Sequence, residues 1–350
     1  MTMSKHGWTY KKFEDCLKKF KTPSKIKSSE YYRSGLYPVI SQEQEYISGY
    51  NNSAEKIFHH DKPVVVFGDH SRVVKYVDFD FIVGADGVKI LLVRDELNPR
   101  FFYYYIKWID VQSLGYSRHY KVLKENYIPV PPMGEQEAIV AELDKINSAI
   151  DELKLQVADL GTLAQATFYD MFGDPVTNPK AWPVKKLGEV CFLKAGKNIK
   201  ASELSQKPSE GLYPCYGGNG IRGYIAKKSH EGCFPIIGRQ GALCGNVVLA
   251  TGSFYATEHA VVCQPLEELN TIFLFFALKE MNLNQYAKGV AQPGLAVSSI
   301  TPLFLPIPPM PLQQEFAARV KAIEEAKAEL KAQMADMQAL LASRMQYWFD

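Results

Sequence analysis

Two stretches of the chain place an apolar residue at every third or fourth position, the pattern of a helix with one apolar face. The first opens with PVPPMGEQEAIVAELD at Pro129, and the second opens with PIPPMPLQQEFAARVK at Pro306, 177 positions later. In the first stretch the apolar positions are Ile139, Leu143, Ile146, Ile150, Leu153, Val157 and Leu160. In the second stretch the matching residues are Phe316, Val320, Ile323, Lys327, Leu330, Met334 and Met337. Alternating intervals of four and three predict a heptad seam along each helix.

Each helix carries its own start signal, a Pro-Pro pair that fixes φ and lacks N–H groups, as suits a first helical turn. For one stretch alone, an ordinary amphipathic core helix is the simpler interpretation, because three heptads are near the lower limit for a coiled coil. The duplication instead favours two helices that pair antiparallel. We expect Leu143, Ile146, Ile150 and Leu153 to pack against Val320, Ile323, Leu330 and Met334. Lys327 is the charged residue in the seam, and such a residue fixes register or partner choice at some cost in stability.

The remaining sequence predicts two globules that are also duplicated. Short β-rich runs separated by Gly, Asn and Asp are typical of compact mixed globules. GLYPV at Gly35 recurs as GLYPC at Gly211, and VVFG ending at Gly68 corresponds to PIIG ending at Gly238. FFYYYIKWI and IFLFFALKEM each predict a buried helix.

The sequence therefore predicts an α+β fold with an internal pseudo-twofold repeat. Two similar mixed α/β domains alternate with two long antiparallel coiled-coil helices. The expected boundaries are 1–127 for the first domain, 128–181 for the first helix and its linker, 182–304 for the second domain and 305–350 for the second helix.

Composition and charge narrow the function. No apolar run approaches the ~18 residues of a membrane span, and MTMSKHGWTYKK lacks the apolar segment of a signal peptide, so we expect a cytoplasmic protein without a membrane partner. The six cysteines never form CxxC, so we expect free thiols rather than zinc ligands or disulfides. The two helical stretches together carry a charge of −7, which leaves +9 on the rest of the chain. This distribution indicates that the globules meet a polyanion while the helices meet protein.

No motif in the chain predicts catalysis. GNGIRG at Gly218 matches GxGxxG, but no helical pattern follows it, so we interpret it as a tight turn rather than a nucleotide site. His59, His60, Asp61, Asp69 and His70 lack any established metal-ligand spacing, and we assign no metal site. No nucleophile, general base or P-loop is recognisable, so no catalytic residue is assigned.

Polar loops at matching places in the two globules are the candidate DNA contacts. GDHSR follows one apolar strand and GRQG follows another, and Arg and Gln suit the base edges of guanine and adenine. Ordinary solvated loops remain an equal alternative for any single residue, and recurrence at matching points favours contact. The candidate DNA-binding residues are Lys11, Lys12, Lys18, Lys19, His70, Ser71, Arg72, Ser117, Arg118, His119, Asn219, Arg222, Arg239, Gln240 and Gln292.

These features together resemble the specificity subunits of type I restriction-modification systems. The resemblance rests on the segments IPVPPMGEQEAIVAELD, LPIPPMPLQQEFAARV, LYPVISQEQEYISGY, LYPCYGGNGIRGY, GYSRHYK and VVVFGDHSRVVKYVDFDFIVGADGVKIL, and it covers essentially the whole chain. It implies two target recognition domains, each binding one half of a split, asymmetric sequence in double-stranded DNA. The chain itself would have no activity.

The resemblance also implies partners. Two methyltransferase subunits would bind S-adenosylmethionine, and two motor-nuclease subunits of the full complex would use ATP and Mg, so this chain would hold no cofactor. We assign partner contact to Gln136, Glu137, Gln313 and Gln314 at the helix starts. Two alternatives stay open: a recognition-domain fragment of a fused methyltransferase-nuclease, and a scaffold of two ligand-binding globules that does not bind nucleic acid.

Overall fold

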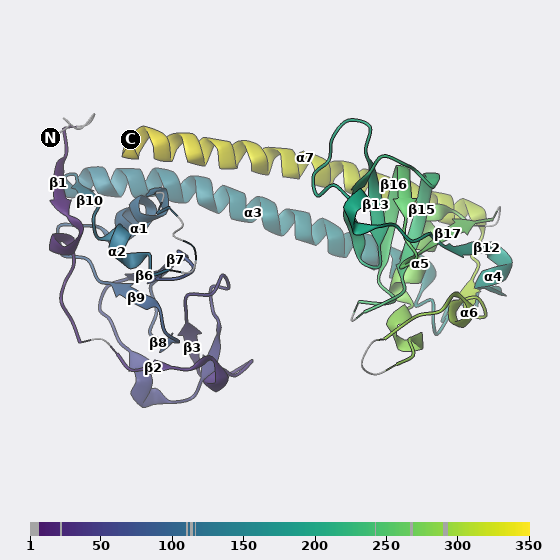
Figure 1. The fold of residues 1–350 in the computed structure, drawn as a ribbon, viewed down its shortest axis with the longest axis horizontal. Coiled ribbons are helices and arrows are strands. Elements are labelled where there is room, and N and C mark those ends of the chain that lie inside the picture. The colour runs from purple at the N-terminus through teal and green to yellow at the C-terminus, as the bar shows by residue number, and fades with distance from the viewer. Residues whose placement is uncertain are drawn as a thin grey trace. The chain divides into compact units, whose positions relative to one another are not determined.

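The computed structural model describes residues 7–21, 23–109, 111–112, 115, 117–241, 243–266, 269–289 and 293–350. Two compact units divide the chain between them. The first unit comprises Met1–Leu153 and Gln333–Asp350, and the second comprises Lys154–Ala332. Both long helices, α3 (Met133–Phe172) and α7 (Met310–Phe349), contribute residues to each unit (Figure 1). The domain limits expected from the sequence stay a prediction.

The first unit contains one mixed sheet, one antiparallel sheet and a two-stranded ribbon. The ribbon joins β1 (Thr9–Lys12) to β10 (Tyr127–Val130). The mixed sheet contains β2 (Lys25–Ile26), β8 (Phe81–Gly84), β3 (Tyr37–Ile40), β4 (Gly49–Asn51) and β5 (Ile57–Phe58). The antiparallel sheet has the order β7 (Val74–Val77), β6 (Val64–Gly68), β9 (Val88–Leu91). The helices of this unit's globule are α1 (Pro99–Trp108) and α2 (Tyr120–Leu123), with 3-10 turns at Phe13–Cys16, Ser28–Glu30 and Ala54–Lys56.

The second unit combines a ribbon with one six-stranded sheet. Its ribbon joins β11 (Val184–Lys186) to β18 (Phe304–Pro306). The sheet has the order β12 (Cys191–Ala195), β17 (Ala260–Pro265), β15 (His230–Gly238), β16 (Val247–Ala256), β13 (Tyr213–Gly217), β14 (Gly220–Ile225). The helices of its globule are α4 (Leu187–Val190), α5 (Thr271–Glu280) and α6 (Val297–Ile300), with 3-10 turns at Ala201–Glu203 and Leu283–Tyr286.

Strand register confirms the duplication of the globules. Gly68 of β6 faces Val88 of β9, and Gly238 of β15 faces Ala260 of β17, both antiparallel. The parallel pairs β3·β8 and β13·β16 also correspond. The two predicted buried helices are α1 and α5, each capped by an Asn whose side chain accepts two backbone N–H groups. GNGIRG forms the tight turn between β13 and β14, and the strand that follows it excludes the dinucleotide interpretation.

Within each unit the long helices run antiparallel, as predicted. In the first unit, Glu142 near the start of α3 accepts hydrogen bonds from Arg344 and Trp348 near the end of α7. In the second unit, the rings of Phe168 and Phe172 near the end of α3 lie 5.6 and 5.3 Å from that of Phe316 near the start of α7. Every predicted seam position in either helix is buried or half-buried.

The residue pairs expected along the seam are partly wrong. Leu143 packs in a core cluster with Met345 and Phe349, whereas Val320 packs in a different cluster with Phe168. The reason is geometric: Leu143 and Val320 both lie near the beginnings of their helices, and antiparallel pairing brings each beginning against the other helix's end. The Lys327 side chain is 16% exposed, pairs with Glu324 at 2.7 Å and lies beside Gly161.

Candidate DNA interface

Three segments of the first unit meet at one end of the β6–β9 pair and form what we call the first loop cluster: residues 68–73, Gly87 and residues 117–120. Asp69 is 2% exposed and organises the cluster. Its backbone N–H donates to the Gly87 carbonyl at 2.7 Å, and its carbonyl accepts from the His119 N–H at 2.8 Å. Its carboxylate accepts the Tyr120 N–H at 2.8 Å. Backbone bonds therefore fix the loops that carry the candidate side chains.

The second unit repeats this scaffold in a second loop cluster: Gly218 and Asn219, residues 238–241 and 243–246, residues 257–259 and residues 293–295. The Arg239 N–H donates to the His259 carbonyl at 2.9 Å, and the Arg239 carbonyl accepts from the Leu295 N–H at 2.8 Å. Arg239 thus occupies the place of Asp69, and His259 that of Gly87. Both clusters share backbone geometry while their side chains differ.

Loop length distinguishes the two clusters. The Gly68 N–H donates to Val73 in the first, and the Gly238 N–H donates to Asn246 in the second, so the second loop is three residues longer. Arg72 has a left-handed φ of 62° and bonds back to Gly68, as Gly245 with φ 85° bonds back to Gly238. Arg72 therefore corresponds to Gly245 and not to Arg239.

Several candidate side chains hold the first cluster together. The exposed Arg72 donates from Nη1 to the Val111 carbonyl at 2.9 Å, which ties its strained loop to the segment after α1. The Ser71 hydroxyl accepts the Val73 N–H at 3.3 Å. His119 is buried, and its Nδ1 lies 3.0 Å from the Asp69 carbonyl. Ser117 and His70 are half-buried, and Arg118 is exposed.

The second cluster also contains both side chains that hold its loops together and side chains that are exposed. Arg239 donates from Nε to Leu295 and from Nη1 to the Glu258 carbonyl, at 3.3 and 3.2 Å, so its guanidinium anchors two loops. Asn219 is exposed and accepts a hydrogen bond from Asn246 at 2.6 Å. Gln240 is exposed, and so is Arg222, which lies on β14 outside the cluster. Gln292 lies outside the described residues.

Sequence reasoning missed two residues of the second cluster. His259 Nε2 lies 3.0 Å from Glu258 Oε1, whereas the buried Oε2 of Glu258 has no hydrogen-bond partner among the described residues. The neighbouring Thr257 hydroxyl is likewise buried without a partner in the described part of the chain. An unmade hydrogen bond of a buried polar atom costs about 1–3 kcal/mol. Alignment of ATEHAVV with GADGVKI matches Glu258 with Asp86 and His259 with Gly87, so the sequence could have indicated both residues.

Comparison with known proteins agrees with this duplicated arrangement. Residues 5–158 and 179–336 match the family described as "Type I restriction modification DNA specificity domain". The chain belongs to this family.

Members of this specificity family resemble the chain in part of its sequence or in its fold. The EcoprrI specificity subunit of Escherichia coli is 42% identical over 195 residues, covering 54% of this chain and 48% of that protein. The chain spans about half the length, or less, of the curated relatives it matches first. A type I restriction-modification S subunit from M. genitalium has the same fold, with a TM-score of 0.61, 18% identity and coverage of 98% and 96% of the two chains. A second solved structure, from work on complex assembly and conformational transition of the type I R-M system, has a TM-score of 0.56 and 15% identity, with coverage of 98% and 97% of the two chains.

The basic segment of this specificity-family chain lies on β1 and the turn after it, where the ring of Phe13 lies 5.9 Å from that of Tyr120 in the first loop cluster. Lys11 pairs with Glu96 at 2.6 Å. Lys18 and Lys62 both pair with Asp95, and these two ammonium groups lower the pKa of Asp95 to about 2. Lys12 and Lys19 are exposed. Lys12 and Lys19 are therefore more available for phosphate contact than Lys11 and Lys18.

The four residues assigned to partner contact divide into two kinds. Gln136 and Gln313 are fully buried. Gln136 bonds the backbone of Asn98, Glu96 and Pro131, and Gln313 bonds that of Asn270 and Pro308. Their amides hold the start of each long helix against its globule, so these two side chains are not available to a partner. Glu137 and Gln314 are exposed and remain the candidates.

No group of three or more His, Cys, Asp or Glu in the described ranges is arranged to hold a metal ion. None of the helices in the described part of the chain combines the length and apolar character that a bilayer crossing needs.

Proposed function

We propose that this chain is the non-catalytic DNA specificity subunit of a type I restriction-modification complex, in which each unit binds one half of a bipartite, asymmetric DNA target. The observation that carries the proposal is the repeated loop cluster. Two scaffolds with the same backbone bonds present different exposed polar side chains, Arg118 in one and Gln240 and Asn219 in the other. Such scaffolds suit contact with two different sets of base edges.

Within the second half-site we propose that Glu258 also reads a base. A carboxylate in a DNA-facing loop repels phosphates but accepts a hydrogen bond from the amino group of cytosine. Its Oε2 is buried and has no hydrogen-bond partner among the described residues, so the loops around it would have to move for such a donor to reach it.

The same proposal assigns the helices to protein partners. Glu137 and Gln314 would contact two methyltransferase subunits, which would hold S-adenosylmethionine, and two motor-nuclease subunits would bring ATP and Mg. We expect the complex in the cytoplasm and the half-site centres about one helical turn apart, ~10 base pairs or somewhat more.

Mapping methylated adenines in cells that carry this chain and its cognate methyltransferase tests the proposal. A bipartite asymmetric motif that disappears when the gene is deleted is the expected result. S-adenosylmethionine binding by the purified chain would instead support a fragment of a fused methyltransferase-nuclease. If the purified chain showed no salt-sensitive, sequence-selective binding to duplex DNA, the alternative of a ligand-binding scaffold that does not bind nucleic acid would be favoured.

A further inference from the structure

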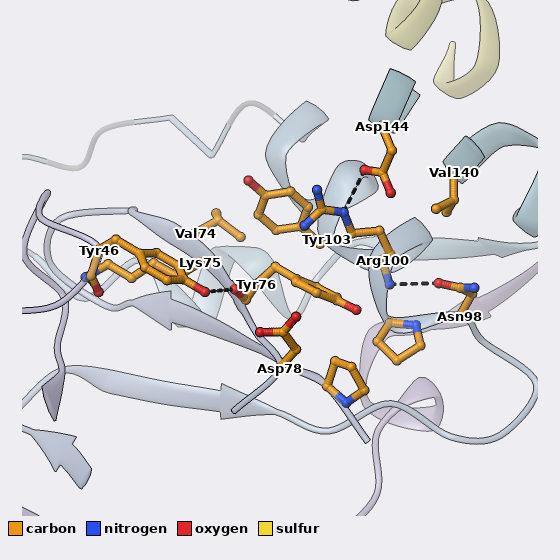
Figure 2. Close-up of a pocket in the computed structure, with 12 residues that line it drawn as sticks. Tyr46, Val74, Lys75, Tyr76, Asp78, Asn98, Arg100, Tyr103, Val140 and Asp144 are labelled. Carbon is orange, nitrogen blue, oxygen red and sulfur yellow. Dashed lines mark hydrogen bonds and ion pairs between the residues drawn. The ribbon is translucent and has the colours of Figure 1, made fainter. Parts of the chain in front are cut away.

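The first unit contains a polar cleft of about 710 Å³ that lies outside its loop cluster. Its walls come from β7 and the residues after it, from the start of α1 and from α3 (Figure 2). The side chains that carry its chemistry are Tyr76, Asp78, Arg100, Tyr103, Val140 and Asp144. The proposed DNA contacts use none of them.

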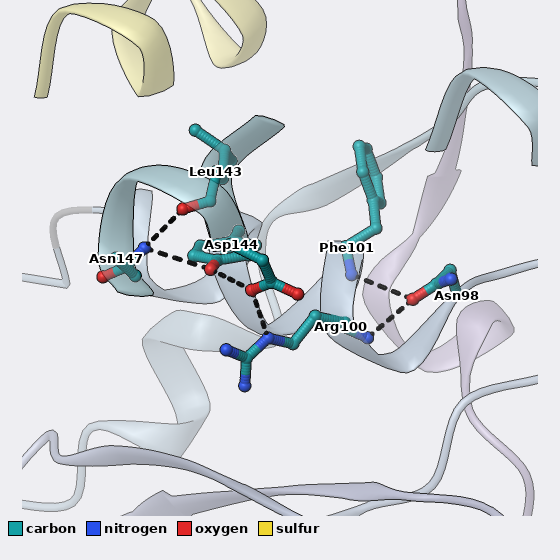
Figure 3. Close-up of polar contacts among 7 residues, drawn as sticks. Asn98, Arg100, Phe101, Leu143, Asp144 and Asn147 are labelled. Carbon is teal, nitrogen blue, oxygen red and sulfur yellow. Dashed lines mark hydrogen bonds and ion pairs between the residues drawn. The ribbon is translucent and has the colours of Figure 1, made fainter. Parts of the chain in front are cut away.

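Arg100 is fixed in this cleft on three sides. Its Nε donates to Asp144 at 2.8 Å, and its guanidinium carbon lies 4.6 Å from the Tyr76 ring centre and 5.2 Å from that of Tyr103. The two terminal nitrogens extend away from Asp144 (Figure 3). The side chain keeps 30% of its surface exposed. Arg100 is thus a preorganised cation whose terminal fork faces the cleft.

A hydrogen-bonded chain behind Arg100 holds Asp144 in place. The Tyr104 hydroxyl donates to Asp144 and accepts from the Asn147 amide at 3.0 Å (Figure 3). Asn147 also donates to the Leu143 carbonyl at 2.9 Å, within α3. The position of the guanidinium is therefore set by the helix and not by a flexible loop.

The charges that line the cleft favour a single carboxylate over a polyanion. Lys75 is 4% exposed and donates to the carbonyls of Glu45 and Tyr46, and burial lowers its pKa, so its charge is directed into the protein. Arg100 remains as the cation that faces the cleft, with Asp78 and Asp144 beside it. Asp78 and Asp144 would repel successive phosphates of a nucleic acid, whereas a single carboxylate can contact the terminal nitrogens of Arg100 on the side away from Asp144. Valine, proline and tyrosine side chains form the other walls and suit the apolar part of a peptide.

The position of the cleft indicates which molecule brings the carboxylate. Val140 and Asp144 follow Glu137 by three and seven positions and therefore lie on the same face of α3. We infer that the cleft receives a carboxylate-bearing peptide segment of the methyltransferase partner, bound end-on by the two terminal nitrogens of Arg100. This rests on the proposed function, in which a partner docks along α3.

The second repeat does not reproduce this chemistry. Ile272, Phe275 and Lys321 stand where the first repeat has Arg100, Tyr103 and Asp144. The carboxylate site therefore serves one of the two methyltransferase copies, which makes the two docking events unequal.

The test measures binding of purified cognate methyltransferase subunit to the full chain by titration calorimetry, in parallel with a duplex DNA that contains the target. Arg100→Gln is expected to weaken one of two binding events about tenfold, the value of a charge-assisted hydrogen bond. Asp78→Asn removes a repelling carboxylate and should strengthen the same event. Arg33→Gln, at an exposed arginine elsewhere in the unit, is the matched control and should leave both events unchanged.

Opposite effects of Arg100→Gln and Asp78→Asn cannot both arise from loss of folding, so their combination supports the site. Equal affinities in all three variants overturn the inference while leaving the proposed function intact. A loss of DNA affinity in Arg100→Gln with unchanged methyltransferase binding overturns it in favour of a phosphate contact. Failure of the unaltered chain to bind any methyltransferase overturns the proposed function and the inference together.

Discussion

The side-chain oxygen of Gln136 accepts the backbone N–H of Asn98 at 2.7 Å, and Asn98 in turn caps α1. The Gln136 amide donates to the Glu96 and Pro131 carbonyls at 2.9 and 2.8 Å. Gln313 makes the corresponding bonds to Asn270 at 2.8 Å and to Pro308 at 2.8 Å. One buried glutamine in each repeat thus joins a long helix to the helix of its globule.

Gln136→Leu should lower the free energy of unfolding by about 2–5 kcal/mol, because it leaves two carbonyls and one N–H buried without partners. Gln313→Leu should have a similar effect in the second unit. Urea unfolding measures both changes. Gln314→Leu, at the exposed neighbouring position, is the control and should change stability by less than about 0.5 kcal/mol. If Gln136→Leu behaved like the control, the amide bonds would contribute nothing to the attachment.

The anchored and the exposed members of the second loop cluster should respond differently. Gln240→Ala should relax specificity in one half of the target, at about 1–3 kcal/mol for a lost bidentate base contact. Arg239→Ala removes bonds to Leu295 and Glu258, so it should weaken binding to that half-site by loosening the loops. Maps of methylated adenines from cells with each variant separate the two outcomes. Relaxation of both halves by Gln240→Ala would contradict the assignment of one half-site to each unit.

Glu258→Gln tests the proposed contact with an amino group. Glutamine keeps an oxygen acceptor but loses the charge, and its amide can also donate, so a cytosine preference at one position should broaden. Competition binding with duplexes altered at single positions measures this change. Glu189→Gln, at an exposed acid elsewhere in the second unit, provides the control. A uniform gain in affinity for all duplexes would mean that Glu258 acts only by repelling phosphates.

The sequence predicted the elements that depend on local pattern. The heptad seam, the α1 and α5 helices and the duplication all follow from periodicity or from repeated motifs. The burial of Gln136 did not follow, because it depends on the start of α1 some 40 residues earlier in the chain. The equivalence of Arg72 with Gly245 was hidden by three extra loop residues, and it became visible only from φ and the bonds to Gly68 and Gly238.

The basic segment should contribute phosphate contacts unequally. Replacing Lys12 and Lys19 by Gln should weaken binding to all duplexes alike and lower the slope of log K against log salt by about two, since each contact displaces about one counterion. The same change at Lys11 and Lys18 should have a smaller effect, because these side chains must first leave Glu96 and Asp95. Fluorescence anisotropy over a salt series measures both slopes. A larger change of the salt slope on replacing Lys11 and Lys18 than on replacing Lys12 and Lys19 would show that the ion pairs do not compete with DNA.

Protonation of Glu142 should weaken the pairing of α3 with α7 in the first unit. Hydrogen bonds from Arg344 and Trp348 hold the pKa of Glu142 below its usual value, with the Arg344 bond the larger cause. Because the folded state has the lower pKa, this contribution is complete above the pKa of the unfolded chain and is lost as pH falls through the folded value. Urea midpoints between about pH 7 and pH 3 should therefore fall more steeply in the unaltered chain than in Glu142→Gln, whose amide does not titrate. Glu137→Gln, at an exposed position on the same helix, should keep the slope of the unaltered chain. Parallel curves for the unaltered chain and Glu142→Gln would show that the carboxylate contributes no pH-dependent stability to the helix pair.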